Sequence, residues 1–402
     1  MRFIRLQMED EVMIDFDFVS PTKIYFGNNK EQLIGHICAE GQYKRVFIVI
    51  GQGSVKRNGL LNRVLTSLDQ SNIKYHILEG ARPNPTIELC HKGIEEARVF
   101  VPNLILAIGG GSAIDTAKNI AAGYFYSGDS FDFNLHKAKP KKALPIGVIL
   151  TISASGSELS NSCVIQDDKK QIKRGFNDDL IRPVFAIENP KLTYSVSKVQ
   201  TAYGIVDIMM HTLERYFNAS SNNEPADGFA EALLKSVIKA ANTVINNPTD
   251  YDARAVLMLM SSLSHNDLTS IGKGKLLFVH QFEHAVSGVY PEVAHAAGLA
   301  VLFPAWAKYY VSLDTDKFNQ LATNVFGLHG KNKLDNAKTG IAQIEKLFST
   351  LGMPKTFKDL GIDNPDIDRL VNLITNNGEK TIPHHIKDMD KEVLKAIFKS
   401  CL

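Results

Sequence analysis

Cysteine is scarce in this chain, and the few that occur form no metal or redox motif. The four cysteines, Cys38, Cys90, Cys163 and Cys401, lie far apart, and none belongs to a C-x-x-C pair. This distribution is typical of free thiols in a reducing compartment and gives no support for a thiolate-held structural zinc.

Long apolar runs and an excess of one charge are also missing. No stretch approaches the roughly 20 apolar residues of a membrane span, and the N-terminal MRFIRLQMEDEV has acidic residues where a signal peptide needs an apolar segment. Lys and Arg total 45 against 43 Asp and Glu. We therefore expect a cytoplasmic protein whose partner is a small molecule, with no nucleic acid and no membrane.

The length of 402 residues predicts two domains. Strand-like apolar runs alternate with helical patterns in the first half and end in a glycine turn or a proline. These runs are RVFIVI (45–50), KYHIL (74–78), NLILAIG (103–109), ALPIGVILT (143–151) and PVFAIENP (183–190). Such alternation predicts a doubly wound α/β domain with a parallel sheet, over residues 1–190.

Two further strand features are predicted in that half. The segment 12–27, broken at Ser20-Pro21, is expected to form a strand pair, and residues 151–176 a polar loop followed by a hairpin that turns at Asp167-Asp168-Lys169. Beyond residue 190 the periodicity is helical, as in 230–245, 253–263 and 336–352. The sequence predicts an all-helical domain over residues 191–402.

Histidine gathers in the helical half. His280, His284 and His295 lie within one short stretch, and Asp207 precedes His211 by four residues. In a helix an i, i+4 pair shares one face, so Asp207/His211 and His280/His284 can each present two ligands. One carboxylate and up to three imidazoles would suit Fe2+, Zn2+, Co2+ or Mn2+. Either pair alone is more often a solvated or core pair.

Two glycine- and hydroxyl-rich turns follow predicted strands. Gly109, Gly110, Gly111 and Ser112 lie between a strand and a helix, where backbone N–H groups and the helix N-terminus can bind a diphosphate. The run 151–157 places hydroxyls at the carboxyl end of the next strand, which suits ribose and phosphate contacts. A tight packing turn and an ordinary loop are the alternatives. Together with a metal site, these turns favour an oxidoreductase.

The segments GGGSAIDTAK (109–118), TISASGSE (151–158), DIMMHTLE (207–214) and 280–304 together resemble the iron-containing, metal-dependent alcohol dehydrogenase family. The likeness spans essentially the whole chain and is nearest to the NADPH-linked butanol dehydrogenases and aldehyde reductases. It implies a dehydroquinate synthase-like architecture, with a dinucleotide-binding domain followed by a helical domain.

The resemblance also implies roles for particular residues. Asp207, His211, His280 and His295 would be the metal ligands, and His284 a catalytic histidine beside the substrate. The cofactor would contact Gly109, Gly110, Gly111, Ser112, Asp115, Thr151, Ser155, Ser157 and Lys173. The chain departs from the family at Ser155, usually threonine, at Ala296, usually glycine, and by one extra residue near Pro291.

The turn after the strand 45–50 bears on cofactor choice. Gly51, Gly53 and Ser54 offer room and donors where an NAD-preferring protein commonly has an acidic residue, and Lys56 and Arg57 follow. We also include Asn84, which follows the next strand, among the cofactor contacts. We predict NADP(H), with NAD(H) as a second possibility and one divalent metal, Fe2+ or Zn2+.

The sequence-based hypothesis is a homodimeric enzyme that interconverts small primary alcohols and aldehydes. A dehydrogenase of a polyol or phosphorylated polyol on the same fold is the alternative. A lyase with transient NAD chemistry and a non-catalytic nucleotide-binding protein are less favoured, because the predicted ligand set is complete and no Lys/Arg cluster accompanies it.

Overall fold

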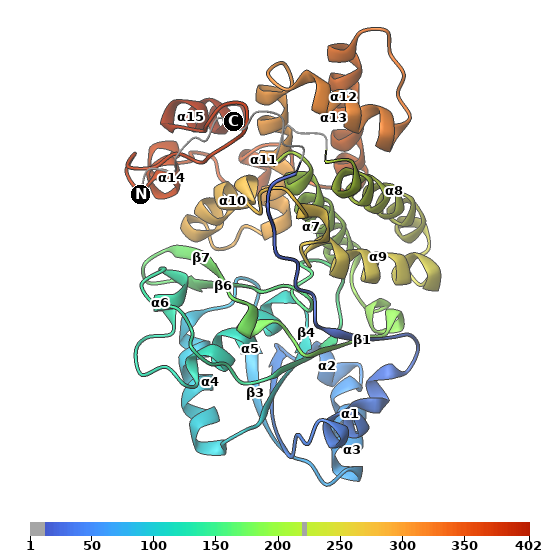
Figure 1. Cartoon of the computed structure of the whole chain (residues 1–402), viewed down its shortest axis with the longest axis vertical. Coiled ribbons are helices and arrows are strands. Elements are labelled where there is room, and N and C mark those ends of the chain that lie inside the picture. The colour runs from blue at the N-terminus through green and yellow to red at the C-terminus, as the bar shows by residue number, and fades with distance from the viewer. Residues whose placement is uncertain (1–12, 219–222) are drawn as a thin grey trace.

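Six parallel strands form the central sheet of the N-terminal half (Figure 1), in the order β1-β8-β5-β4-β2-β3. The computed structural model describes residues 13–218 and 223–402. The strands are β1 Lys23–Phe26, β2 Arg45–Gly51, β3 Lys74–Ala81, β4 Leu104–Gly109, β5 Ile146–Leu150 and β8 Phe185–Glu188.

Alternate residues of these strands are buried against helices on opposite faces of the sheet. Phe47 and Val49 of β2 pack in the same core as α4 and α5, whereas Val46 and Ile48 pack with α1 and α3. The helices and 3-10 turns of this half are η1 Lys30–Leu33, α1 Ile34–Glu40, α2 Ser54–Arg57, α3 Leu60–Gln70, α4 Ile87–Phe100, α5 Gly111–Gly123, α6 Phe131–Asn134, η2 Asp179–Ile181 and η3 Pro190–Thr193. Burial on both faces explains the continuous apolar runs.

The sheet order reverses between β2 and β4. From β2 the chain adds β3 on one side, and it then crosses to β4 and builds β5 and β8 on the other side. Ligands of doubly wound sheets bind at the carboxyl ends of the strands where the order reverses. The turns that follow Gly51 and Gly109 stand at this point.

The predicted hairpin forms, and the predicted N-terminal strand pair does not. Strands β6 Ser162–Asp167 and β7 Ile172–Asn177 pair antiparallel outside the main sheet. Of residues 12–27, Val12 lies outside the described residues, and only β1 is a strand, which pairs with β8. The segment before Pro21 instead runs along the helical half, where the Ile14 N–H donates to the Gly272 carbonyl at 3.2 Å.

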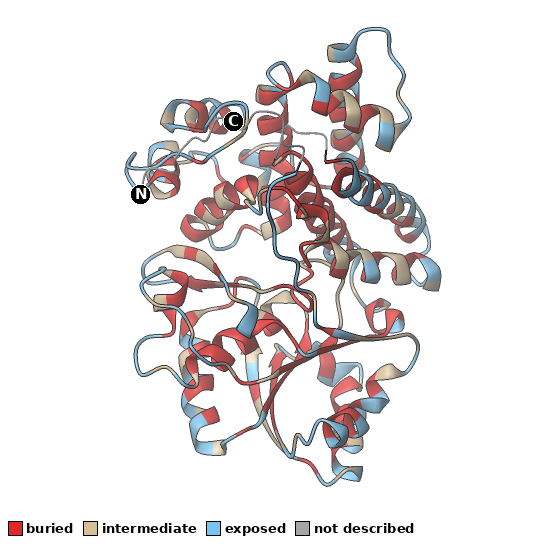
Figure 2. Ribbon diagram, viewed as in Figure 1, coloured by how far each residue is buried: buried red, intermediate tan, exposed pale blue. Residues whose placement is uncertain are grey.

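The second half is helical around one large core, and the ribbon of its central helices is coloured largely as buried (Figure 2). Its elements are α7 Lys198–Tyr216, α8 Glu224–Asn246, α9 Tyr251–Ser264, η4 Leu268–Ser270, α10 Phe278–Val289, α11 His295–Tyr310, α12 Thr315–Phe326, α13 Lys333–Thr350, η5 Lys358–Leu360, α14 Ile367–Thr375 and α15 Lys391–Lys399. None of the helices described is both long and apolar enough to cross a membrane. The predicted fold class is confirmed.

Candidate active site

Three helices of the second half bring the predicted metal ligands together. Asp207 and His211 lie on α7, His280 on α10 and His295 at the first position of α11. Asp207, His211 and His280 are buried among apolar neighbours. Because His295 begins its helix, the positive end of the α11 dipole also faces this site.

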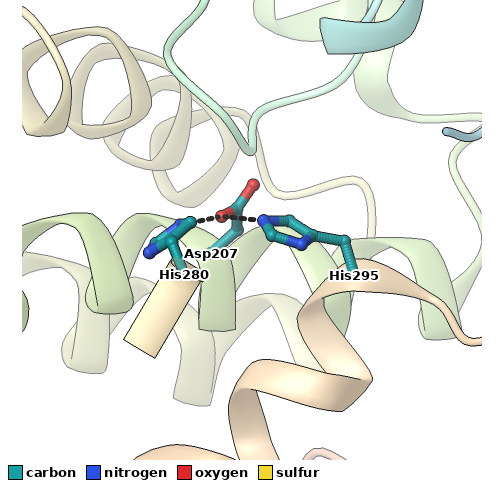
Figure 3. Close-up of side chains that lie close together, drawn as sticks. All are labelled: Asp207, His280 and His295. Carbon is teal, nitrogen blue, oxygen red and sulfur yellow. Dashed lines mark ion pairs between the residues drawn. The ribbon is translucent and has the colours of Figure 1, made fainter. Parts of the chain in front are cut away.

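Two imidazoles point at one carboxylate oxygen (Figure 3). The Nε2 atoms of His280 and His295 lie 3.6 and 3.8 Å from Asp207 Oδ1. These three residues can each offer one ligand atom, all within 4.8 Å of one another. His211 stands beside this group, with its Nδ1 3.5 Å from the same oxygen and its ring stacked on His280 at 4.5 Å between centroids.

Two buried glutamates set the tautomers of these histidines. Glu214 accepts from His280 Nδ1 and from the Val279 N–H at 2.5 Å. Glu283 accepts from His295 Nδ1. A carboxylate behind a ligating histidine holds the proton on the far nitrogen and leaves the near nitrogen free for a metal. The Nε2 atom of each histidine is therefore the one directed toward Asp207.

The residues fit a divalent cation by their unsatisfied atoms. Asp207 Oδ1, His280 Nε2 and His211 Nδ1 are buried and have no hydrogen-bond partner in the structure. Burial by itself would lower the pKa of His280, but the charges of Glu214 and Asp207 outweigh it and raise the pKa to about 9, so the surroundings favour a positive charge here. Buried acceptors that converge without donors are costly unless a cation satisfies them.

His284 lies next to this group without belonging to it. Its ring centroid is 5.6 Å from that of His295 and 6.3 Å from that of His280. Burial lowers its pKa well below the ordinary value. His284 forms a second possible group with Glu283 and His295 rather than with Asp207. The two-ligand edge that i, i+4 spacing allowed for His280 and His284 is therefore not formed around Asp207.

One large cavity connects this group to the glycine turns. Its volume is about 1200 Å³, above the usual 300–1,000 Å³ range of ligand sites and sufficient for a dinucleotide with a small substrate. All the predicted ligands, His284 and the predicted cofactor contacts line it, with the exception of Gly53. Gly53 instead caps α2 in a left-handed conformation, with φ 108°.

The turn after β4 leaves little space for any residue larger than glycine. A Cβ on Gly110 would lie 2.2 Å from Ile152 Cγ2, and one on Gly111 would lie 2.5 Å from Ser155 Oγ. Helix α5 begins at Gly111, so its first N–H groups face the cavity. The loop 151–157, called the hydroxyl loop below, thus packs directly on the turn, and the backbone of the turn is the surface offered to a phosphate.

Two predicted cofactor contacts are engaged within the protein. Asp115 accepts from the Ser157 hydroxyl at 2.6 Å and from the Val164 N–H at 3.0 Å. The Lys118 ammonium also donates to Ser157 Oγ at 2.9 Å. Asp115 and Ser157 line the cavity, but these bonds tie α5 to the hydroxyl loop and to the hairpin.

Only part of the turn after β2, which was predicted to favour NADP(H), lines the cavity. Gly51 and Ser54 line it, whereas Lys56 and Arg57 are not among its described lining residues. Lys56 instead forms an ion pair with Glu79. Asn84, with φ 55°, donates from Nδ2 to the Pro291 carbonyl at 3.2 Å, so it contacts the loop that holds the extra residue.

Sequence reasoning missed Glu214, Glu283 and His265. The two glutamates lie three residues after His211 and His280, on the helices that supply the ligands, which is the signal that could have found them. His265 lines the cavity and meets His211 edge-on, with 4.2 Å between ring centroids. No motif surrounds His265, so only the fold reveals it.

Two family models and several known proteins match nearly the whole length of the chain. The family model described as iron-containing alcohol dehydrogenase matches residues 21–190, and that of the C-terminal region of the same family matches 201–402. NADH-dependent butanol dehydrogenase A of Clostridium acetobutylicum is 39% identical, over 96% of this chain and 99% of that protein. NADPH-dependent aldehyde reductase YqhD of Escherichia coli is 29% identical, over 96% of this chain and 100% of its own.

One solved structure has the same fold over nearly the whole chain. The crystal structure of NADH-dependent butanol dehydrogenase A from Thermotoga maritima superposes with a TM-score of 0.92 at 33% identity, covering 97% of this chain and 99% of that one. With the ligand group and the cavity already placed, the conclusion follows: the chain belongs to the iron-containing alcohol dehydrogenase family and is an NAD(P)-dependent alcohol dehydrogenase.

Proposed function

We propose that this enzyme interconverts small primary alcohols and aldehydes with NADPH and one divalent metal, Fe2+ or Zn2+. The observation that carries the proposal is the convergence of Asp207 Oδ1 with two Nε2 atoms in the cavity that the 109–112 turn also lines. A metal site and a dinucleotide turn in one cavity suit hydride transfer at a polarised carbon–oxygen bond.

Asp207, His211, His280 and His295 would hold the metal, which would act as a Lewis acid on the substrate oxygen while the nicotinamide exchanges the hydride. Glu214 and Glu283 keep the imidazoles in the metal-binding tautomer. The start of α5 would bind the diphosphate. His284 lies beside His295 in the same cavity and would pass the proton between the substrate oxygen and solvent.

The preference for NADPH rests on the neutral turn at Gly51 and Ser54, which carries no carboxylate to repel a 2′-phosphate. NADH is the second candidate, because the Lys56 ammonium is paired with Glu79 and the 39% identical relative is named as NADH-dependent. The ratio of kcat/KM for the two cofactors tests this choice. A Gly51→Asp variant should lose more efficiency with NADPH than with NADH.

A polyol is the second candidate substrate. The cavity wall also carries Arg215, His265, Asp267 and Lys275, and such polar groups favour a substrate with a second hydroxyl. A relative named 1,3-propanediol dehydrogenase, from Citrobacter freundii, is 24% identical. Higher kcat/KM with 1,3-propanediol than with 1-butanol would support this candidate.

The deciding experiment is an assay of NAD(P)H oxidation with unbranched aldehydes of two to eight carbons. Metal-stripped enzyme should be inactive and should regain activity on reloading with Fe2+ or Zn2+, with Mn2+ and Co2+ as comparison metals. Full activity of the stripped enzyme would overturn the proposal.

A further inference from the structure

Glu283 lies at the junction of the two halves of the molecule. Its Oε2 accepts from His295 Nδ1 and lies 3.3 Å from Lys173 Nζ. Lys173 belongs to β7 of the hairpin, and its ammonium also donates to Ser287 Oγ at 3.0 Å and lies 3.4 Å from His295 Nδ1. One carboxylate thus contacts a predicted metal ligand and a predicted cofactor contact.

The surrounding backbone makes room for this carboxylate. A Cβ on Gly298 would lie 2.9 Å from Glu283 Cγ, and one on Gly288 would lie 3.3 Å from the Lys173 N atom. Two glycines therefore let α11 and β7 approach α10 closely enough for these contacts. The Glu283 side chain is fully buried, and Lys173 is 5% exposed. A buried charge of this kind is retained only with partners in place.

A second metal site is the competing reading of this cluster, because Glu283, His284 and His295 can present three ligand atoms together. The Lys173 ammonium argues against it, because its positive charge lies 3.3 Å from Glu283 Oε2 and 3.4 Å from His295 Nδ1, where it would repel a second cation. Glu283 Oε2 lies between the Lys173 ammonium and the His295 imidazole, and both donate to it. The carboxylate is therefore a charged acceptor for these two partners.

We propose that Glu283 is a positioning residue that couples the metal centre to the cofactor domain. It fixes His295 with Nε2 toward Asp207, and it holds the Lys173 ammonium at the cavity wall. Contact of a dinucleotide with Lys173 is then transmitted through one carboxylate to a metal ligand. This inference rests on the proposed function, because it takes His295 as a ligand and Lys173 as a cofactor contact.

Binding of Co2+ to the metal-stripped full-length protein tests the coupling without any turnover. Glu283→Gln removes the negative charge that holds the His295 imidazole and the Lys173 ammonium, so Co2+ affinity should fall about 10- to 100-fold and the visible Co2+ spectrum should change. Lys173→Met should raise the KM for NADPH and lower Co2+ affinity by a smaller factor. In the double variant the fold-decrease in Co2+ affinity should be clearly smaller than the product of the fold-decreases in the two single variants.

Two control variants separate coupling from general damage. Glu214→Gln acts on His280 and has no bond to Lys173, so its loss of Co2+ affinity should multiply with that of Lys173→Met. Ser287→Ala removes one bond to Lys173 and leaves the Glu283–His295 bond intact, so it should raise the KM for NADPH with unchanged Co2+ affinity. Thermal unfolding by circular dichroism verifies that each variant is folded.

The outcomes distinguish a failure of the proposed function from a failure of the positioning role of Glu283. Wild-type protein that binds no Co2+ would overturn the proposed function itself. Wild-type binding together with an unchanged affinity and spectrum in Glu283→Gln would overturn the positioning role. Losses that multiply in the Glu283→Gln/Lys173→Met pair would show that the two side chains act independently, which would overturn the coupling.

Discussion

Two carboxylates that are not themselves predicted ligands decide which nitrogen each histidine can offer to a metal. Glu214 and Glu283 each hold a proton on the Nδ1 of a histidine, so the free nitrogen is the one that faces Asp207. Without such an acceptor an imidazole can present either nitrogen. The chemistry of the site is therefore set by the partners of the ligands as much as by the ligands.

The ligand assignment predicts a joint loss of metal and activity. Asp207→Ala and His280→Ala should lower both metal content and turnover to below roughly 1% of wild type, because removal of a ligand should cost more than the 10- to 100-fold typical of a residue behind a ligand. Metal analysis after dialysis and the aldehyde assay measure the two quantities. Wild-type metal content in Asp207→Ala would refute the assignment.

His284→Ala is the matched variant for that comparison. It should keep the metal, because His284 does not group with Asp207, and it should slow turnover by about 10²- to 10⁴-fold if the imidazole carries the proton. A metal-free His284→Ala protein would instead identify His284 as a ligand.

A pair of buried carboxyl groups away from the metal predicts a pH effect on stability. Glu158 and Glu188 share the Ser262 hydroxyl, at 2.7 and 2.9 Å. Burial, and then the charge of Glu158, raise the pKa of Glu188 from 4.5 to about 8. Because the folded state binds this proton more tightly, the stabilising contribution is complete below pH 4.5 and is lost as pH rises through about 8.

The free energy of unfolding of Glu188→Gln should therefore increase relative to that of wild type as pH rises. The two proteins should unfold with similar free energy at pH 5, and the variant should be more stable by a few kcal/mol at pH 9, since a tenfold change in an equilibrium constant is about 1.4 kcal/mol. Urea unfolding at pH 5, 7 and 9 gives this difference. Glu95→Gln, at an exposed site, is the control that should show no such trend.

At the scale of elements, the start of α5 is the least tolerant part of the cofactor cavity. Its glycines lie against Ile152 and Ser155 with no space for a Cβ. The hydroxyl loop that provides these contacts follows β5, so the two neighbouring strands support each other's turns. A helix start held in this way is rigid before the cofactor arrives, which lowers the cost of binding.

Gly110→Ala should destabilise the protein by about 1–3 kcal/mol and weaken cofactor binding, because the new methyl group overpacks against Ile152. Gly228→Ala is a suitable comparison, since it lies within α8 with nothing within 4 Å of the added Cβ. That change should stabilise by about 0.5–1 kcal/mol. Denaturant unfolding and cofactor titration should separate the two variants, and equal behaviour would contradict this account.

At the scale of the whole molecule, an exposed apolar segment supports the predicted homodimer. Residues 13–19 run extended before β1, and Phe16 and Phe18 are each 44% exposed. Exposed apolar groups gathered in one stretch are typical of an association surface. Phe16→Asp with Phe18→Asp should shift the protein from dimer to monomer in sedimentation, whereas Val99→Asp, at another exposed apolar site, should not. A monomeric wild type would refute the dimer.

The sequence by itself determined the elements and the local chemistry. Continuous apolar runs predict buried parallel strands, and i, i+4 spacing places Asp207 and His211 on one face of α7, because both follow from short-range backbone geometry. The prediction of a strand pair over residues 12–27 was wrong, because strand-like composition alone does not provide a neighbouring strand to pair with.

Only the tertiary structure decided which groups meet. Lys173 and Glu283 are far apart in the chain, and no periodicity of either segment encodes their contact. The pairing of Lys56 with Glu79, which occupies a basic side chain beside the turn after β2, is equally nonlocal. Such contacts depend on how the halves pack, and packing is set by the shape of many buried side chains together rather than by any one motif.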